Sequence, residues 1–156
     1  MKQNESLLQL MREGILMNEM KPAQVVEEMT FKRAFERCVR EKYVTFSGRA
    51  SRSEYWKFTL IYVIILLVAQ ALDAGLFPHT VDETGMGGTI TTIVTILLFL
   101  PVFTAQIRRL HDIGKSGWWI LWEFLPLIGT LVLLYFWVKP SEKGTNKYGP
   151  QPSETL

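Results

Sequence analysis

Cysteine and histidine are scarce in this chain of 156 residues, which contains one cysteine and two histidines. The single cysteine, Cys38, excludes an intrachain disulfide and any metal site built of cysteine alone. It falls on the apolar side of a predicted helix, where a buried and inert thiol is typical. The two histidines, His79 and His111, lie far apart in the sequence. We therefore predict no metal site and no cofactor.

Signatures of common enzymes and of secretion are also missing. The sequence contains neither the GxSxG motif of serine hydrolases nor the HExxH motif of zinc proteases. A cleavable secretory signal is not expected, because the first long apolar run begins only at Phe58 and no small-residue cleavage site follows it. The net charge is only +2, and no nucleic-acid partner is expected.

Long apolar runs are what the sequence has instead. They cover Phe58–Phe77, Thr89–Ile107 and Trp118–Val138. A helix of about 20 apolar residues crosses a hydrocarbon core of ~30 Å. We therefore predict an all-α fold, a small polytopic membrane helical bundle of about three transmembrane helices, with spans at about 55–77, 89–108 and 118–138.

The third run is the ambiguous one. Pro126 and Gly129 interrupt it near the middle, and Glu123 places an ionisable group inside it. We predict a single kinked span, which puts the C-terminal tail outside the cell. The alternative is a re-entrant hairpin that turns at residues 126–129 and returns the tail to the cytoplasm.

The polar parts of the chain divide into an extension, an interfacial helix and a tail. Residues 1–29 have a weak helical pattern and are predicted to be a poorly ordered or surface-lying extension of the membrane domain, residues 30–152. Residues 31–44 combine an apolar and a basic face at helical spacing, which is typical of an amphipathic helix in the membrane interface. Its apolar face could equally pack on the transmembrane bundle. Residues 139–156 form a polar tail.

The distribution of charge predicts the orientation. Residues 30–57 carry eight Lys and Arg against three Glu, while the loop Pro78–Gly88 carries none against Asp82 and Glu83. Cytoplasmic loops near membrane spans are enriched in Lys and Arg. We therefore expect a multi-pass membrane protein with a cytoplasmic N-terminus.

The motif GRASRSEYW precedes the first span. Ser51 and Glu54 have the spacing of a capping box at a helix start. Arg49 and Arg52 lie three residues apart beside the free amides of that start, which suits a lipid phosphate or another anion. The alternative is a topology anchor, in which Arg52 pairs with Glu54 or Asp112.

The motif RRLHDIGKSGWW separates the second and third runs. Arg108 and Arg109 add cationic charge to the same side of the membrane. His111 and Asp112 are candidates for an acid–base pair, since histidine titrates near neutral pH. Adjacent helical side chains point about 100° apart, however, so the two cannot face each other without a turn. We therefore predict no catalytic residue unless the protein is an enzyme, in which case these two would serve.

Three segments resemble the domain-of-unknown-function 805 family of bacterial inner-membrane proteins: KYVTFSGRASRSEYWKF, RRLHDIGKSGWW and the tail GTNKYGP. The resemblance covers roughly residues 30–152 and implies a compact multi-span helical protein of the inner (plasma) membrane with no established activity. Glu123 departs from the family pattern, which has an aliphatic residue there, so a role for it would be particular to this chain. The structural motif positions that the resemblance implies are Gly48, Ser51, Glu54, Tyr55, Trp56, Gly114, Ser116, Gly117, Trp118, Asn146, Tyr148 and Gly149.

Three functions remain open. We favour a non-enzymatic module whose cytoplasmic cluster binds anionic lipid headgroups or a partner protein through Arg49, Arg52, Arg108, Arg109, His111 and Asp112. The first alternative is a small oligomeric transporter or channel component, with a path lined by Gln70, Asp73 and Glu123. The second is a membrane-embedded enzyme acting on lipid headgroups. The expected partners are anionic membrane lipids, with a second copy or another membrane protein as the alternative.

Overall fold

The part of the chain that the structure describes is built of helices. The computed structural model describes residues 28–81 and 87–152, and its regular elements there are all helical. An isolated bridge between Asn146 and Gly149 is the one extended pairing in those ranges. Most of the extension predicted at residues 1–29 falls outside them.

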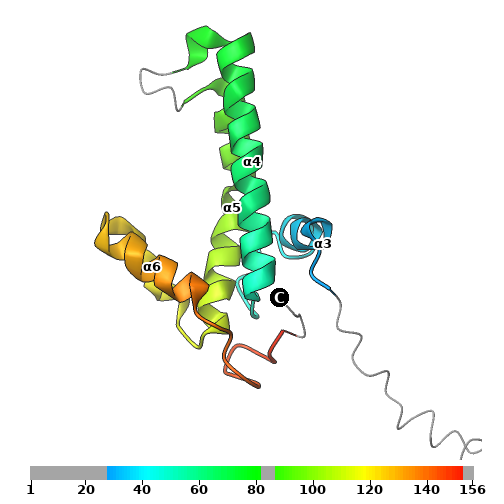
Figure 1. Cartoon of the computed structure of the whole chain (residues 1–156), viewed down its shortest axis with the longest axis vertical. Helices are drawn as coiled ribbons and strands as arrows, with labels where there is room; N and C mark the ends of the chain where they lie inside the picture. Colours follow the sequence, from blue (N-terminus) through cyan, green and yellow to red (C-terminus); the bar gives the residue numbers. More distant parts are fainter. Residues whose placement is uncertain (1–27, 82–86, 153–156) are drawn as a thin grey trace, which may run out of the picture.

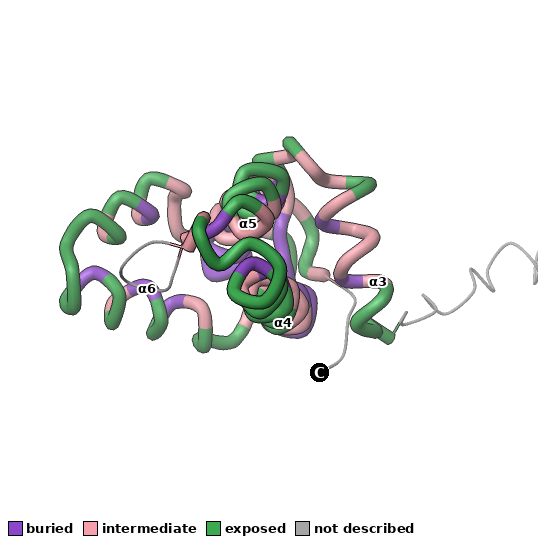
Figure 2. Tube along the Cα trace, turned by 90° about the horizontal axis from the view of Figure 1, so that it is seen from above, coloured by how far each residue is buried: buried purple, intermediate pink, exposed green. Residues whose placement is uncertain are grey.

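Two helices form the axis of the molecule (Figure 1). Helices α4 (Arg52–Leu76) and α5 (Thr89–Asp112) are both long and apolar enough to cross a membrane, and the apolar helix α6 (Ile128–Val138) is shorter. The helices α4 and α5 pack side by side, with α3 on one side of the pair and α6 on the other (Figure 2). The prediction of an all-α membrane bundle is confirmed.

The far end of the α4–α5 pair is held together by Asp73. This buried carboxylate accepts hydrogen bonds from Ile90 N at 2.8 Å and Thr91 N at 2.7 Å, at the start of α5. Free amides and the helix dipole favour a negative charge there. Gly88 permits the approach, because a Cβ at that position would come within 2.4 Å of Asp73 Cγ. A short 3₁₀ turn, η2 (Pro78–Thr80), follows α4 on this side.

Pro101 lies inside α5 and removes the hydrogen bond that would otherwise reach the carbonyl of Leu97. The hydroxyl of Tyr43 donates to that carbonyl oxygen instead. A proline in a membrane helix is tolerated where a neighbouring group satisfies the freed carbonyl. The segment before α4 therefore completes the hydrogen bonding of α5.

The predicted amphipathic helix packs its apolar face on the α4–α5 pair. It consists of α3 (Phe31–Glu36), begun by the Thr30 side chain, which accepts from Arg33 N at 3.1 Å, and a π-helical turn, η1 (Arg37–Glu41). Met29, which the prediction assigns to the extension, is buried in the same core. The shared core consists of Met29, Ala34, Cys38, Tyr55, Phe58 and Ala105.

The third apolar run differs from the single span predicted for residues 118–138. It forms a 3₁₀ helix, η3 (Gly117–Phe124), then turns back into α6. Leu127 adopts φ +65° in the turn, and Gly129 packs so closely that a Cβ would come within 1.6 Å of Trp122 O. The α6 helix is roughly 16 Å long at 1.5 Å per residue, which is too short to cross a ~30 Å core. The hairpin alternative describes this segment better.

The outward faces of α4 and α5 are apolar. Green, exposed positions cover the outer sides of both helices in Figure 2, and they include Leu67 and Ile96. Large apolar patches on a water-soluble monomer are unusual. Their continuity over two long helices is typical of a surface that lipid covers.

Candidate functional site

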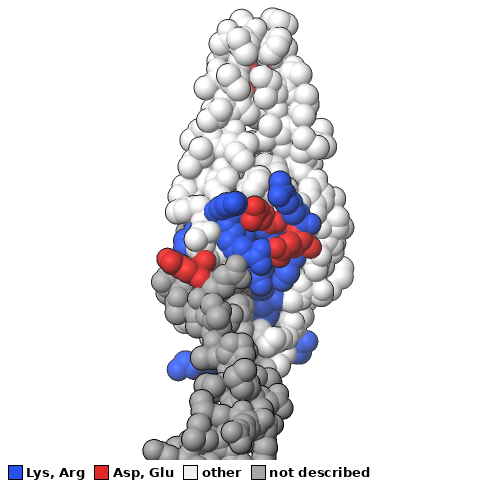
Figure 3. All heavy atoms as spheres, turned by 90° about the vertical axis from the view of Figure 1, so that its right-hand side faces the viewer, with Lys and Arg blue, Asp and Glu red and all other residues white. Residues whose placement is uncertain are grey.

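Charged side chains gather at one end of the α4–α5 pair. On the face shown in Figure 3, Lys, Arg, Asp and Glu gather in one band, and the part of the molecule above this band is almost free of charge. The start of α4 and the end of α5 also hold a set of buried charged residues that we call the ionic cluster: Arg49, Glu54, Arg108, Arg109 and Asp112. Each of its members is at most 4% exposed.

The first half of the ionic cluster is centred on Glu54. One carboxylate oxygen pairs with Arg108, and the other lies 3.4 Å from a guanidinium nitrogen of Arg37. Arg108 also approaches Cys38 Sγ at 3.5 Å. Removing one partner from a buried ion pair is far more costly than the pair itself is stabilising. The pair therefore makes the α4 start and the α5 end depend on each other.

The second half is centred on Asp112. Arg49 Nε lies 3.0 Å from Asp112 Oδ1, and Arg109 and the hydroxyl of Ser141 both bond Oδ2. Three donors from three separate segments thus converge on one carboxylate. Charge-assisted hydrogen bonds of this kind are roughly twice as strong as neutral ones.

The two arginines around Asp112 also hold the C-terminal tail, residues 139–152. Arg49 donates to the carbonyl of Gly144 at 2.7 Å and also to that of Glu142. Arg109 donates to the carbonyl of Trp137 at 3.1 Å and to that of Lys139. The last carbonyls of a helix lack partners within it and carry partial negative charge. The arginines supply those partners at the end of α6 and bring the tail to the start of α4.

His111 is packed against the tail. Its ring stacks on Tyr148 with centroids 3.8 Å apart and an angle of 4° between planes. Its Nδ1 lies 3.3 Å from the carbonyl oxygen of Gly48. Asn146 Nδ2 donates to the backbone carbonyl of His111 at 3.0 Å. The tail motif and the two loop motifs therefore meet in one place, on the side to which the hairpin returns the chain.

The structure brings together five of the six predicted ligand-binding residues: Arg49, Arg108, Arg109, His111 and Asp112. Arg52, the sixth, is half-buried beside the cluster and forms no ion pair with Glu54 or Asp112. Ser51 Oγ accepts from Glu54 N at 3.0 Å, as the capping box predicts. The remaining motif residues Gly114, Ser116, Gly117 and Trp118 form the turn from α5 into η3.

Arg52 lines a groove of about 330 Å³ at the start of α4, which we call the headgroup groove. Its other lining residues are Ser53, Trp56, Lys57 and Val138. Lys57 Nζ donates to the carbonyl of Met29 and lies 5.8 Å from the Phe31 ring centroid. The groove combines two cations with an indole and an aliphatic wall.

The three residues predicted to line a transport path do not lie along one groove. Asp73 caps α5, and Gln70 lies near it on α4. Glu123 lines a separate groove of about 520 Å³ between α4, α5 and η3. Among the described residues, no group of three His, Cys, Asp or Glu could hold a metal ion.

Sequence reasoning missed the partners that lie on the tail. Ser141, Glu142 and Lys139 contribute a hydroxyl and backbone carbonyls, which leave no mark in a sequence pattern. In the sequence, residues 139–156 contain three lysines against two glutamates, a mild bias toward a cytoplasmic tail. Cys38 lies beside the ion pair of Arg108 and Glu54. Burial, with a smaller contribution from the Glu54 charge, raises the pKa of its thiol to about 12.

Comparison with known proteins gives a consistent picture. A family model described as "Protein of unknown function (DUF805)" matches residues 43–150. The chain is 42% identical over 114 residues to "Inner membrane protein YhaH" of Escherichia coli strain K12, covering 73% of this chain and 92% of that protein. It is 40% identical over 117 residues to "Inner membrane protein YhaI" of the same strain, covering 73% and 91%. No solved structure is significantly similar to it.

Proposed function

The chain belongs to the DUF805 family, and from that premise we propose that it is a non-enzymatic inner-membrane module that binds anionic lipid headgroups at the boundary where its tail meets α4. The family has no established activity, so the proposal depends on the geometry of this chain. Its two parts are an internal clasp, formed by the ionic cluster, and an outward-facing groove.

The ionic cluster is better suited to holding the chain together than to binding a ligand. Arg49, Arg108 and Arg109 are buried, and each donates a hydrogen bond to a carboxylate. Arg49 and Arg109 also donate to carbonyls of the tail. A lipid phosphate would have to displace these internal acceptors. We therefore assign Arg49, Arg108, Arg109 and Asp112 to the clasp, and keep Arg52 as the ligand-binding residue.

The observation that carries the proposal is the composition of the headgroup groove. Arg52 is half-exposed, and no carboxylate of residues 28–81 or 87–152 lies within 4 Å of its guanidinium. Lys57 and the exposed Trp56 lie on the same groove. Guanidinium suits bidentate contact with phosphate, and tryptophan is enriched at the level of lipid headgroups. In this proposal a headgroup phosphate lies beside the cations of the groove, and an acyl chain lies along Val138.

We place this end of the molecule at the cytoplasmic leaflet. The 14 Lys and Arg of the described residues lie before α4 or in its first two turns, at the end of α5, or after it, and none lies in the rest of these two helices. The return of the tail to the same end then makes the C-terminus cytoplasmic too. Reporters fused after Leu156 should be active in the cytoplasm only, and activity in the periplasm would contradict the orientation.

The experiment compares lipid binding by two variants that lose the same charge. The purified full chain is titrated with phosphatidylglycerol, and with phosphatidylcholine, and bound lipid is counted by native mass spectrometry. We expect Arg52→Gln to lower phosphatidylglycerol affinity several-fold and leave phosphatidylcholine unaffected. Arg40→Gln, which removes an exposed cation outside the groove, should bind as the parent chain does. Equal phosphatidylglycerol binding by Arg52→Gln and the parent would refute the groove assignment.

A further inference from the structure

The groove that contains Glu123 differs from the headgroup groove in the sign of its charge. It has a volume of about 520 Å³, within the usual range for small-molecule sites. Its walls are mostly aromatic and aliphatic and come from three elements, α4, α5 and η3. None of its lining residues is Lys, Arg or His. Glu123 is therefore the single charged residue on its wall.

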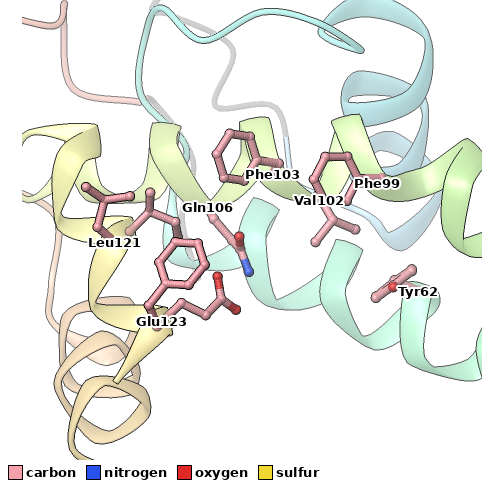
Figure 4. Close-up of a pocket in the computed structure, with 9 residues that line it drawn as sticks. Tyr62, Phe99, Val102, Phe103, Gln106, Leu121 and Glu123 are labelled. Carbon is pink, nitrogen blue, oxygen red and sulfur yellow. The ribbon is translucent and has the colours of Figure 1, made fainter. Parts of the chain in front are cut away.

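Two polar side chains point into this groove toward each other. Figure 4 shows the Gln106 carboxamide on α5 facing the Glu123 carboxylate on η3, with Tyr62 on the opposite wall. The structure gives neither Gln106 nor Glu123 a hydrogen bond or an ion pair within the described residues. Charged groups at membrane depth normally have partners, because an unpaired charge in apolar surroundings is costly. This carboxylate has none in the part of the chain that the structure describes.

The aromatic walls add to the preference for positive charge. Phe99 and Phe103 stack on each other with centroids 5.8 Å apart, and both line the groove together with Phe124 and Tyr62. The faces of aromatic rings attract organic cations, more strongly where water is excluded. A carboxylate, a carboxamide oxygen and several rings form the set that recognises a bulky ammonium or phosphonium ion.

We infer that this groove binds a monovalent lipophilic organic cation, with the positive charge beside Glu123 and Gln106 and the apolar body against the aromatic wall. A zwitterionic phospholipid fits less well, because its phosphate would find no cation on the wall. Fatty acids are disfavoured for the same reason. The inference does not depend on the proposed headgroup site, since the two grooves share no lining residue.

The test uses two ions of the same shape and opposite charge. Tetraphenylphosphonium and tetraphenylborate are each offered to the purified full chain in a neutral maltoside detergent, and binding is measured by equilibrium dialysis against protein-free micelles. We expect saturable binding of about one phosphonium per chain and no saturable binding of the borate. Saturable binding of both ions with similar affinity would overturn the charge-based assignment.

Variants locate the site. Glu123→Gln should weaken phosphonium binding at least tenfold, while Glu36→Gln, the same change on α3, should leave it unaltered. Glu123 is exposed and has no hydrogen bond or ion pair with another described residue, so its variant should keep the parent's elution profile and helical circular dichroism. Leu121→Trp, which narrows the groove and keeps the charge, should also weaken binding at least tenfold. Parent-like binding by either Glu123→Gln or Leu121→Trp would refute the inference.

Discussion

The two ends of the α4–α5 pair are joined by very different chemistry. At the far end, the Asp73 carboxylate on α4 accepts hydrogen bonds from two backbone amides at the start of α5 and so joins the two helices. At the near end, the five buried charged residues of the ionic cluster link α4, α5 and the tail. The far-end contact caps one helix and joins residues fewer than 20 positions apart, whereas the near end connects segments as much as 100 residues apart.

The residues of the sequence motifs form the contacts of the near end. The motifs at the start of α4 and at the end of α5 supply the two carboxylates and the arginines, and the tail supplies acceptors. Buried charges in such an arrangement tolerate few alternative partners, because each lost partner leaves a charge unpaired in a poorly hydrated place. The near end should therefore be sensitive to single substitutions and the far end tolerant of them.

The largest effect is expected from Asp112→Ala. The change leaves both Arg49 and Arg109 buried without their carboxylate, and uncompensated buried charges of this kind cost about 3–5 kcal/mol. Unfolding by SDS in mixed micelles, followed by circular dichroism, measures the loss in free energy of unfolding. Glu36→Gln removes a carboxylate outside the cluster and should cost less than about 0.5 kcal/mol. A loss for Asp112→Ala as small as that of this control would remove the distinction between the two ends.

The next effect is expected at the tail. Arg49→Gln removes the donors to Gly144 and Glu142, and hydrogen bonds from a charged group contribute about 1.5–3 kcal/mol each. We expect the tail to open at least tenfold more often while α4 and α5 stay paired. Limited trypsin cleavage at Lys143 and Lys147, timed by mass spectrometry, reports the opening. Arg40→Gln should be cut at the parent rate, and so would Arg49→Gln if the tail were held by other contacts.

At the far end a smaller loss is expected. Asp73→Ala removes the acceptor for two amides of α5, and loss of an N-terminal cap costs about 1 kcal/mol, with a range of about 0.5–2. Asp73→Asn, which keeps an oxygen acceptor, should lose less. The same SDS unfolding assay compares both with Asp112→Ala. If Asp73→Ala proved as damaging as Asp112→Ala, the two ends would be equivalent and the comparison would fail.

Much of the fold is readable from the sequence because it depends on local patterns. The predicted spans at about 55–77 and 89–108 correspond to α4 and α5, and the Ser51 cap is where the spacing puts it. The path of residues 118–138 is not readable in the same way. Pro126 and Gly129 permit either a kink or a turn, and the choice depends on the contact of Gly129 with Trp122 and on capture of the tail by Arg49.

The candidate site shows the same division. Five of the six candidate residues lie near one another, because the motifs that contain them lie at one end of the spans. The motifs do not predict which way each arginine points. Arg49 and Arg52 are three residues apart, yet one is buried among carbonyls and the other lines a groove. That difference is produced by acceptors on the tail, about 95 residues away for Gly144.

The smallest expected effect is at Cys38, and it tests whether the near end is sealed. Burial raises the pKa of this thiol to about 12, so the folded protein keeps it protonated, and the stability this adds is present below pH 9 and lost as pH rises toward 12.

Maleimide at pH 8 should leave Cys38 almost unlabelled in the parent and label it fully in SDS, measured by intact mass. Asp73→Ala should stay unlabelled, because its damage is confined to the far end. Asp112→Ala should be labelled faster, because loosening the cluster exposes the thiol beside Arg108. Equal labelling of both variants would mean that the ends open together, as one cooperative unit.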